Sequence, residues 1–277
     1  MYPVPHYHNL RSTSGAGKPY GVITRGTTGV NRLRRSDRWT RYNPRVGALL
    51  RCVDTPLALD VGYGASHTTT VEWASWLRQI NPRVEVVGLE IDPQRVLPPR
   101  SGVRFELGGF ELAGYHPHLV RAFNVLRQYD VDEVPSVWSA VCSRLAPGGL
   151  FIEGTCDELG RRAAWVLLDA DGPVSLTLAW DPFDVATPSD IAERLPKALI
   201  HRNVEGEPIW QLLQDADRAY ANAAGWAPHG PRVRWREAHQ ELVTRGWPLA
   251  PSRRRLRDNT LTVAWRAVAP LDWVTDA

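Results

Sequence analysis

The stretch Leu57-Ala-Leu-Asp-Val-Gly-Tyr-Gly-Ala-Ser66 decides the fold that the sequence predicts. Its apolar run breaks at Gly62 and Gly64, which is typical of a buried β-strand that enters a tight turn. A helix is predicted to follow, because Thr69 and Glu72 have the spacing of a capping box and apolar side chains then recur at helical spacing. The order strand, glycine loop and helix leaves bare backbone N–H groups at the helix start, where an anion can bind.

A second buried strand is predicted at residues 84–91, and it places Glu90 at its end. An acid at the tip of the second strand of a βαβ unit is the usual partner of two ribose hydroxyls. Further strands are predicted at residues 103–107, 119–129 and 150–153, and a β-hairpin at residues 164–180. The sequence therefore predicts an α/β fold with a Rossmann-like, doubly wound sheet of the seven-stranded type.

Three motifs of this chain resemble those of class I S-adenosylmethionine-dependent methyltransferases. They are Asp60-Val-Gly-Tyr-Gly-Ala65, Gly88-Leu-Glu-Ile-Asp92, and the turn Pro147-Gly-Gly149 between a predicted helix and a buried strand. The run from Asn124 to Glu158 is also locally similar to chemotaxis-type protein glutamate methyltransferases, which supports the fold and not the substrate. The resemblance implies that S-adenosylmethionine is the cofactor and the methyl donor.

The resemblance also implies roles for individual residues. Around the cofactor it places Asp60, Gly62, Tyr63 and Gly64 at the methionine end, Glu90 on the ribose hydroxyls, Ile91, Gly109 and Phe110 beside the adenine, and Asn124 at the mouth where the methyl group is transferred. Because Gly109 stands where the family often has an acid, adenine recognition would depend on the main chain, on the ring of Phe110 or on Glu111.

Methyl transfer from a sulfonium is an in-line displacement, so positioning of the acceptor matters more than covalent catalysis. The residues expected to orient or deprotonate the acceptor are Asn124, Arg127, Tyr129 and Glu153, with Asp157 as a further candidate. A carboxylate could serve as a base only if burial or a neighbouring acid raised its pKa.

Charge is distributed unevenly along the chain. Residues 1–51 hold ten Lys and Arg against the single acid Asp37, although the net charge of the whole chain is only +3. We expect a basic N-terminal arm (1–51), a cofactor-binding domain (52–182), a mostly helical insert that covers the acceptor (183–258), and a final strand and tail (259–277). Contacts with the substrate are predicted for six residues, Arg25, Arg32, Arg34, Arg35, His201 and Asn203. Alternatively, the arginines form a solvated linker or pair with acids of the domain body.

Composition bounds the remaining expectations. The three cysteines form no Cys-x-x-Cys pair, so the sequence suggests neither a metal site nor a disulfide framework. No signal peptide or membrane-spanning run is apparent, which favours a cytoplasmic protein. The acceptor stays open among RNA, a protein side chain and a small molecule, and the basic arm could bind nucleic acid.

Two other functions compete with methyl transfer. A nicotinamide-dependent oxidoreductase is disfavoured because His67 stands where a third glycine would be expected. A non-catalytic RNA-binding or scaffold module on a methyltransferase fold is favoured by the basic arm, whereas the set of Asp60, Gly62, Gly64 and Glu90 argues against it.

Overall fold

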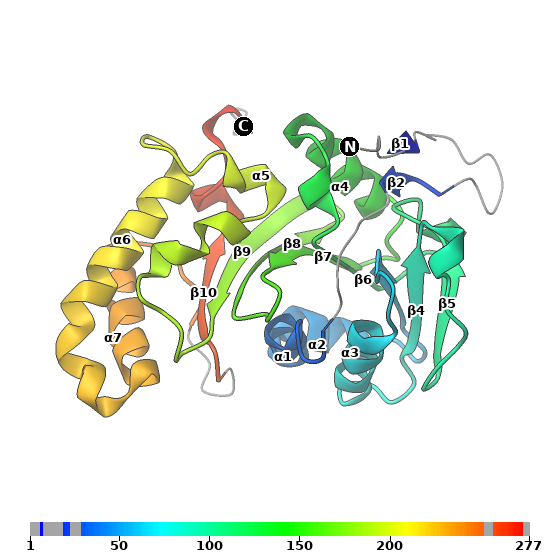
Figure 1. Cartoon of the computed structure of the whole chain (residues 1–277), viewed down its shortest axis with the longest axis horizontal. Coiled ribbons are helices and arrows are strands. Elements are labelled where there is room, and N and C mark those ends of the chain that lie inside the picture. Colours follow the sequence, from blue (N-terminus) through cyan, green and yellow to red (C-terminus); the bar gives the residue numbers. More distant parts are fainter. Residues whose placement is uncertain (1–5, 8–18, 23–28, 252–256, 274–277) are drawn as a thin grey trace.

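The computed structural model of the chain describes residues 6–7, 19–22, 29–251 and 257–273 (Figure 1). Its centre is an eight-stranded sheet with the strand order β10-β9-β8-β7-β6-β3-β4-β5. The strands are β3 (Leu57–Val61), β4 (Glu85–Glu90), β5 (Val103–Leu107), β6 (Leu119–Phe123), β7 (Leu150–Cys156), β8 (Arg162–Asp169), β9 (Gly172–Trp180) and β10 (Asn259–Ala264). A separate pair, β1 (His6–Tyr7) and β2 (Gly21–Val22), is antiparallel.

The sheet has a parallel half and an antiparallel half. The pairs β3–β4, β3–β6, β4–β5 and β6–β7 are parallel. The pairs β7–β8, β8–β9 and β9–β10 are antiparallel. Short connections explain the change, because β7 leads into β8 and β8 into β9 through turns too short for a crossover helix. The predicted α/β class and the hairpin at residues 164–180 are confirmed, and β10 adds an edge strand beyond it.

Helices cover both faces of the sheet (Figure 1). They are α1 (Arg34–Tyr42), α2 (Pro44–Cys52), α3 (Thr68–Arg78), α4 (Val134–Cys142), α5 (Lys197–Ile200), α6 (Pro208–Asn222) and α7 (Pro231–Thr244). Buried residues form two apolar clusters, with α1, α2 and α3 packed on one face and α4 to α7 on the other. Side chains of β8 alternate between the two clusters, which explains why this strand is almost continuously apolar.

Shorter 3₁₀ segments connect the main elements. They are η1 (Pro93–Arg95), η2 (Leu112–Gly114), η3 (Leu126–Gln128), η4 (Val131–Glu133), η5 (Pro188–Arg194), η6 (Ala223–His229), η7 (Trp265–Ala267) and η8 (Leu271–Trp273). In the described part of the chain, no helix combines the length and the apolar character that crossing a membrane requires.

The residues predicted to form the end of the N-terminal arm belong to the α/β body. In α1, Trp39 is buried and makes an edge-to-face contact with Trp165 of β8, with ring centroids 5.5 Å apart. In α2, Val46 and Leu50 are fully buried. Asn43 caps α2 by accepting hydrogen bonds from the first backbone N–H groups. Helices α1 and α2 therefore pack on the α/β body, although the many arginines of this stretch obscure their apolar side chains in the sequence.

The stretch predicted as a helical insert contains α5, α6 and α7, and these helices pack on the sheet rather than standing apart from it. Ile209, Leu212, Leu213 and Ala216 of α6 are buried in the same cluster as the side chains of β9 and β10. This covered face explains why those strands carry apolar residues on that side.

Two local predictions differ from the structure. The strand predicted at residues 119–129 ends at Phe123, because Asn124 turns the chain with a φ of 62°. The predicted capping box of α3 is absent: Ser66 Oγ accepts the N–H of Thr68 instead, and Glu72 accepts the N–H of Asn31.

Candidate functional site

A crevice lies outside the carboxyl ends of the parallel strands, where the strand order reverses. From β3 the sheet continues to β4 on one side and to β6 on the other, and such a switch point is where α/β sheets bind ligands. The loop between β3 and α3 begins at this point with Gly62 and Gly64, which have φ values of 71° and 80°. A Cβ atom on Gly62 would lie 2.6 Å from Cγ2 of Val125, so this position requires glycine.

Glu90 ends β4 and holds the glycine loop in place. Its carboxylate accepts the N–H of Gly64 at 3.0 Å, and also the N–H groups of Ile91 at 3.0 Å and Asp92 at 3.2 Å. The residue is 1% exposed, and burial raises the pKa of its carboxyl, whereas these hydrogen bonds oppose the rise.

The segment after β5 forms a second wall of the crevice. Gly109 donates its N–H to Glu111 Oε1 at 2.8 Å, which fixes the carboxylate beside the turn. The ring of Phe110 is buried and meets the ring of Tyr129 edge to face, with centroids 5.8 Å apart. The sequence predicted that Gly109, Phe110 and Glu111 would contribute here, and the structure brings all three to the same crevice as Glu90.

Strand β2 lies in this crevice. Tyr20 donates its N–H to Glu111 Oε2 at 2.6 Å and accepts the N–H of Phe110 at 2.9 Å, and Val22 donates its N–H to the hydroxyl of Tyr129 at 2.9 Å. With this segment in place the free volume of the crevice is about 10 Å³. That is room for about one water molecule, far below the size of a small-molecule site.

Asp60 belongs to a buried ion-pair network below the glycine loop. Its carboxylate accepts Nε of Arg121 at 2.9 Å and the hydroxyl of Thr70 at 2.8 Å. The guanidinium of Arg121 also pairs with Asp37 of α1 at 2.7 Å and lies over the ring of Trp73, 4.4 Å from its centroid. Burial raises the pKa of Asp37 to about 7, against the influence of Arg121. The contacts of Asp60 favour a structural role over the predicted contact with the methionine end.

Glu153 of β7 is a buried acid. It is 1% exposed, and neither carboxylate oxygen has a hydrogen-bond partner among the residues that the structure describes. Its neighbours in the sheet register are Ala122 and Val166. Burial raises the pKa of its carboxyl to about 8, so the group is largely protonated at neutral pH.

The other residues predicted to contact the acceptor are hydrogen-bonded to groups of the protein itself. Asn124 connects β6 to β7, because its side-chain oxygen accepts the N–H of Cys156 at 2.9 Å. Arg127 donates to the carbonyl of Glu193 at 2.8 Å. Asp157 accepts two backbone N–H groups of the turn before β8 and the N–H of Arg162, which begins β8. Tyr129 faces the crevice, and burial raises the pKa of its phenol.

The arginines predicted to meet a substrate are engaged with the protein body. Arg35 is 2% exposed and pairs with Asp181 at 2.7 Å and Asp258 at 3.4 Å. Arg32 donates to the carbonyl of Asp157 at 3.0 Å, and Arg34 lies 3.5 Å from Asp181. These contacts agree with the alternative interpretation of the sequence, in which the arginines pair with acids of the domain body. They give no support to nucleic-acid binding through a basic arm.

Of the remaining predicted substrate contacts, two lie away from the crevice and one is not described. Arg25 falls outside the described residues. His201 is exposed at the end of α5, and Asn203 follows it with a buried side-chain oxygen that has no hydrogen-bond partner. Neither residue lines the crevice that holds Glu90. Their assignment to an acceptor stays a prediction.

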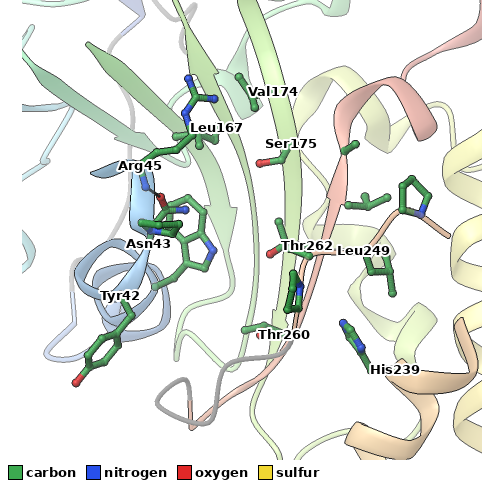
Figure 2. Close-up of a pocket in the computed structure, with 17 residues that line it drawn as sticks. Tyr42, Asn43, Arg45, Leu167, Val174, Ser175, His239, Leu249, Thr260 and Thr262 are labelled. Atoms are coloured by element: carbon green, nitrogen blue, oxygen red, sulfur yellow. Dashed lines mark hydrogen bonds between the residues drawn. The ribbon is translucent and has the colours of Figure 1, made fainter. Parts of the chain in front are cut away.

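A larger cavity of about 440 Å³ lies over the antiparallel half of the sheet. Figure 2 shows Tyr42 and Asn43 on the side of α1 and α2, His239 on the side of α7, and Ser175 and Thr262 of the strands between them. Among the described residues, none of those predicted for the functional site lines this cavity, and no cluster of three or more His, Cys, Asp or Glu is arranged to hold a metal ion.

Sequence comparisons give no relative for this chain, since neither a protein-family model nor a curated protein matches it. Among solved structures, magnesium protoporphyrin IX methyltransferase from Synechocystis PCC 6803 with bound SAM matches 48% of this chain and 67% of its own, at 19% identity and a TM-score of 0.32. A cyclopropane synthase from Mycobacterium tuberculosis matches 39% of this chain and 40% of its own, at 17% identity and a TM-score of 0.29. Mitomycin 7-O-methyltransferase matches 45% and 36%, at 14% identity and a TM-score of 0.32. Likenesses of this size do not establish a function.

Proposed function

We propose that the protein is an S-adenosylmethionine-dependent methyltransferase whose cofactor binds in the crevice between the glycine loop and the segment after β5. The observation that carries the proposal is the convergence of Gly62 and Glu90 on one crevice at the switch point of the sheet, where Glu111 accepts the N–H of Gly109 in the crevice wall. A nucleoside needs a carboxylate for its ribose, a hydrogen-bonding edge for its base and bare backbone for the group attached to its 5′ carbon. The chain supplies each of these from a different strand end.

Each wall of the crevice would bind one part of the cofactor. Glu90 would accept hydrogen bonds from the ribose hydroxyls, since the N–H groups of Gly64, Ile91 and Asp92 already fix its carboxylate. Glu111 and the N–H of Phe110 would meet the adenine edge. The glycine loop would allow the methionine end to approach the backbone. The bound cofactor would supply an activated methyl group, so the protein needs only to position an acceptor in line with it.

Glu153 is the residue of the described chain best suited to exchange a proton with an acceptor. It lies on β7, and the neighbouring strand β6 leads to Val125, which lines the crevice. The carboxyl of Glu153 has a pKa of about 8. A carboxyl with a raised pKa matches the requirement for general acid–base chemistry near neutral pH. Within the described residues its oxygens have no hydrogen-bond partner, so an acceptor hydroxyl or amine that reached this buried position would be the first group to pair with them. The acceptor itself, whether RNA, protein or a small molecule, stays open.

Calorimetric titration of the purified full chain tests the proposal. We expect S-adenosylmethionine and S-adenosylhomocysteine to bind, and NAD and NADP not to bind. The variant Glu90→Ala should weaken S-adenosylhomocysteine binding by about 1 to 3 kcal/mol through the loss of charged hydrogen bonds. Glu85→Ala is the matched control, because Glu85 begins the same strand and is exposed at its other end. Equal affinities of Glu90→Ala and Glu85→Ala would remove the site assignment.

A further inference from the structure

We propose that the backbone of Tyr20, Gly21 and Val22 is an internal occupant of the adenine subsite, and that the nucleoside of the cofactor binds only after this segment has left. The inference rests on the proposed function and adds a device that controls access to the site. It stands on hydrogen bonds, close backbone contacts and free volume within the described residues.

The hydrogen bonds of Tyr20 reproduce those that an adenine would make. Its N–H donates to Glu111 Oε2 at 2.6 Å, and its carbonyl accepts the N–H of Phe110 at 2.9 Å. The Watson–Crick edge of adenine presents the same pair, an amino donor beside a ring-nitrogen acceptor. Tyr20 thus forms hydrogen bonds with both groups that would recognise the base. The base cannot bind to these groups while Tyr20 is in place.

Two glycines allow the segment to lie this close. A Cβ atom on Gly109 would lie 2.2 Å from the carbonyl oxygen of Tyr20, so any other residue at position 109 would exclude the segment from this position. A Cβ atom on Gly21 would lie 2.8 Å from the hydroxyl of Tyr129 and 3.2 Å from Cδ1 of Ile91. An acidic side chain at position 109 is therefore incompatible with the seated segment.

The seated segment excludes the ribose as well as the base. Glu90 is 1% exposed below it, and the free volume between them is about 10 Å³. A nucleoside cannot enter such a space, so binding and seating of the segment compete for one site. The hydroxyl of Tyr129, predicted from the sequence to orient an acceptor, instead accepts the N–H of Val22 and holds the segment down.

Competition of this kind lowers the apparent affinity for the cofactor. The observed dissociation constant equals the intrinsic constant divided by the fraction of molecules whose site is open. A change that unseats the segment without touching Glu90, Phe110 or Glu111 should therefore tighten binding. This sign is opposite to that expected of a lid, whose loss would weaken binding.

The experiment compares full-length variants by calorimetric titration with S-adenosylhomocysteine. Gly21→Val places a branched side chain against Tyr129 and Ile91, and should lower the dissociation constant by roughly tenfold relative to wild type if about one molecule in ten is open. Gly225→Val is the matched control, since a Cβ atom on Gly225 would contact nothing within 4 Å, and its affinity should equal that of wild type. Tyr129→Phe removes the acceptor of the Val22 N–H and should shift the affinity in the same direction as Gly21→Val.

Hydrogen exchange of the wild-type protein supplies a second readout. Addition of S-adenosylhomocysteine should accelerate exchange at the amide of Val22, because its acceptor is lost when the segment leaves. Slower exchange at Val22, or a Gly21→Val variant that binds no more tightly than Gly225→Val, would overturn the inference and leave the proposed function standing. If S-adenosylhomocysteine binds to none of the proteins, Gly21→Val included, the proposed function fails and this inference fails with it.

Discussion

Replacement of Glu153 by glutamine should remove a pH dependence from the stability of the protein. Unfolded, this carboxyl has the ordinary pKa of 4.5, whereas burial raises its pKa to about 8 in the folded chain. Between these values the folded state holds a proton that the unfolded state has released, so the free energy of unfolding falls as pH rises. The slope approaches 1.4 kcal/mol per pH unit, and between about pH 5 and about pH 7.5 the loss amounts to about 3 kcal/mol.

The assay is urea unfolding, followed by the fluorescence of the twelve tryptophans. Glutamine has nearly the shape of a protonated glutamic acid but cannot ionise. Glu153→Gln should therefore resemble wild type near pH 5 and exceed its stability by about 3 kcal/mol near pH 7.5. Other buried acids such as Asp37 and Glu90 titrate in both proteins, so the difference between the two profiles isolates Glu153. Glu205→Gln, at an exposed position, is the control and should run parallel to wild type.

Parallel profiles for wild type and Glu153→Gln would refute the reasoning. They would mean that the carboxyl is ionised in the folded protein and has a partner that compensates its charge. A stabilising effect of Glu153→Gln together with loss of methyl transfer would indicate that the buried acid is kept for function at a cost in stability.

Three further predictions follow from packing and burial. Arg121→Leu should destabilise the protein by about 3 to 5 kcal/mol in chemical unfolding, because it leaves Asp37 and Asp60 buried without their cation; a loss below about 1 kcal/mol would contradict the network. Gly62→Ala should cost at least about 2 kcal/mol more than Gly206→Ala, since both positions have positive φ but only Gly62 would clash with a neighbour. Native protein should react with a thiol reagent at Cys52 alone, because Cys142 and Cys156 are buried and burial raises the pKa of the Cys142 thiol to about 11; mass spectrometry of the labelled protein checks this.

The parallel half of the sheet could be predicted because its signals are local. Strands β3, β4, β5 and β7 begin at or beside a glycine, a proline or a charged residue, and the acid Glu90 marks the end of β4. Glycine at positions 62 and 64 likewise announces a turn whatever the rest of the chain does. The sequence therefore led to the crevice and to half of the residues that line it.

The partners of charged side chains could not be predicted, because they come from elements far apart in the chain. Asp60 looks like a ligand-binding acid until Arg121 is brought beside it from β6. The signal available was a lone arginine inside the apolar strand Leu119–Phe123, which the motif pattern does not use. In the same way, the pairing of Arg35 with Asp181 and Asp258 depends on the fold of the whole body.

The position of residues 20–22 also could not be predicted from the sequence. Tyr20-Gly-Val22 has no periodicity, and its contacts run through backbone groups that every residue carries. Only the absence of an acid at position 109 hinted that another group meets the base-binding edge, and that absence has many explanations.

Arg35 has a consequence for the connectivity of the molecule. It pairs with Asp181, just after β9, and with Asp258, just before β10, while β9 and β10 themselves form an antiparallel ladder. Both ends of the helical insert are thus attached to the body independently of the chain that joins them. A cut in the exposed stretch 224–229 should leave two fragments that remain associated, so the protein is suited to reconstitution from separately produced halves.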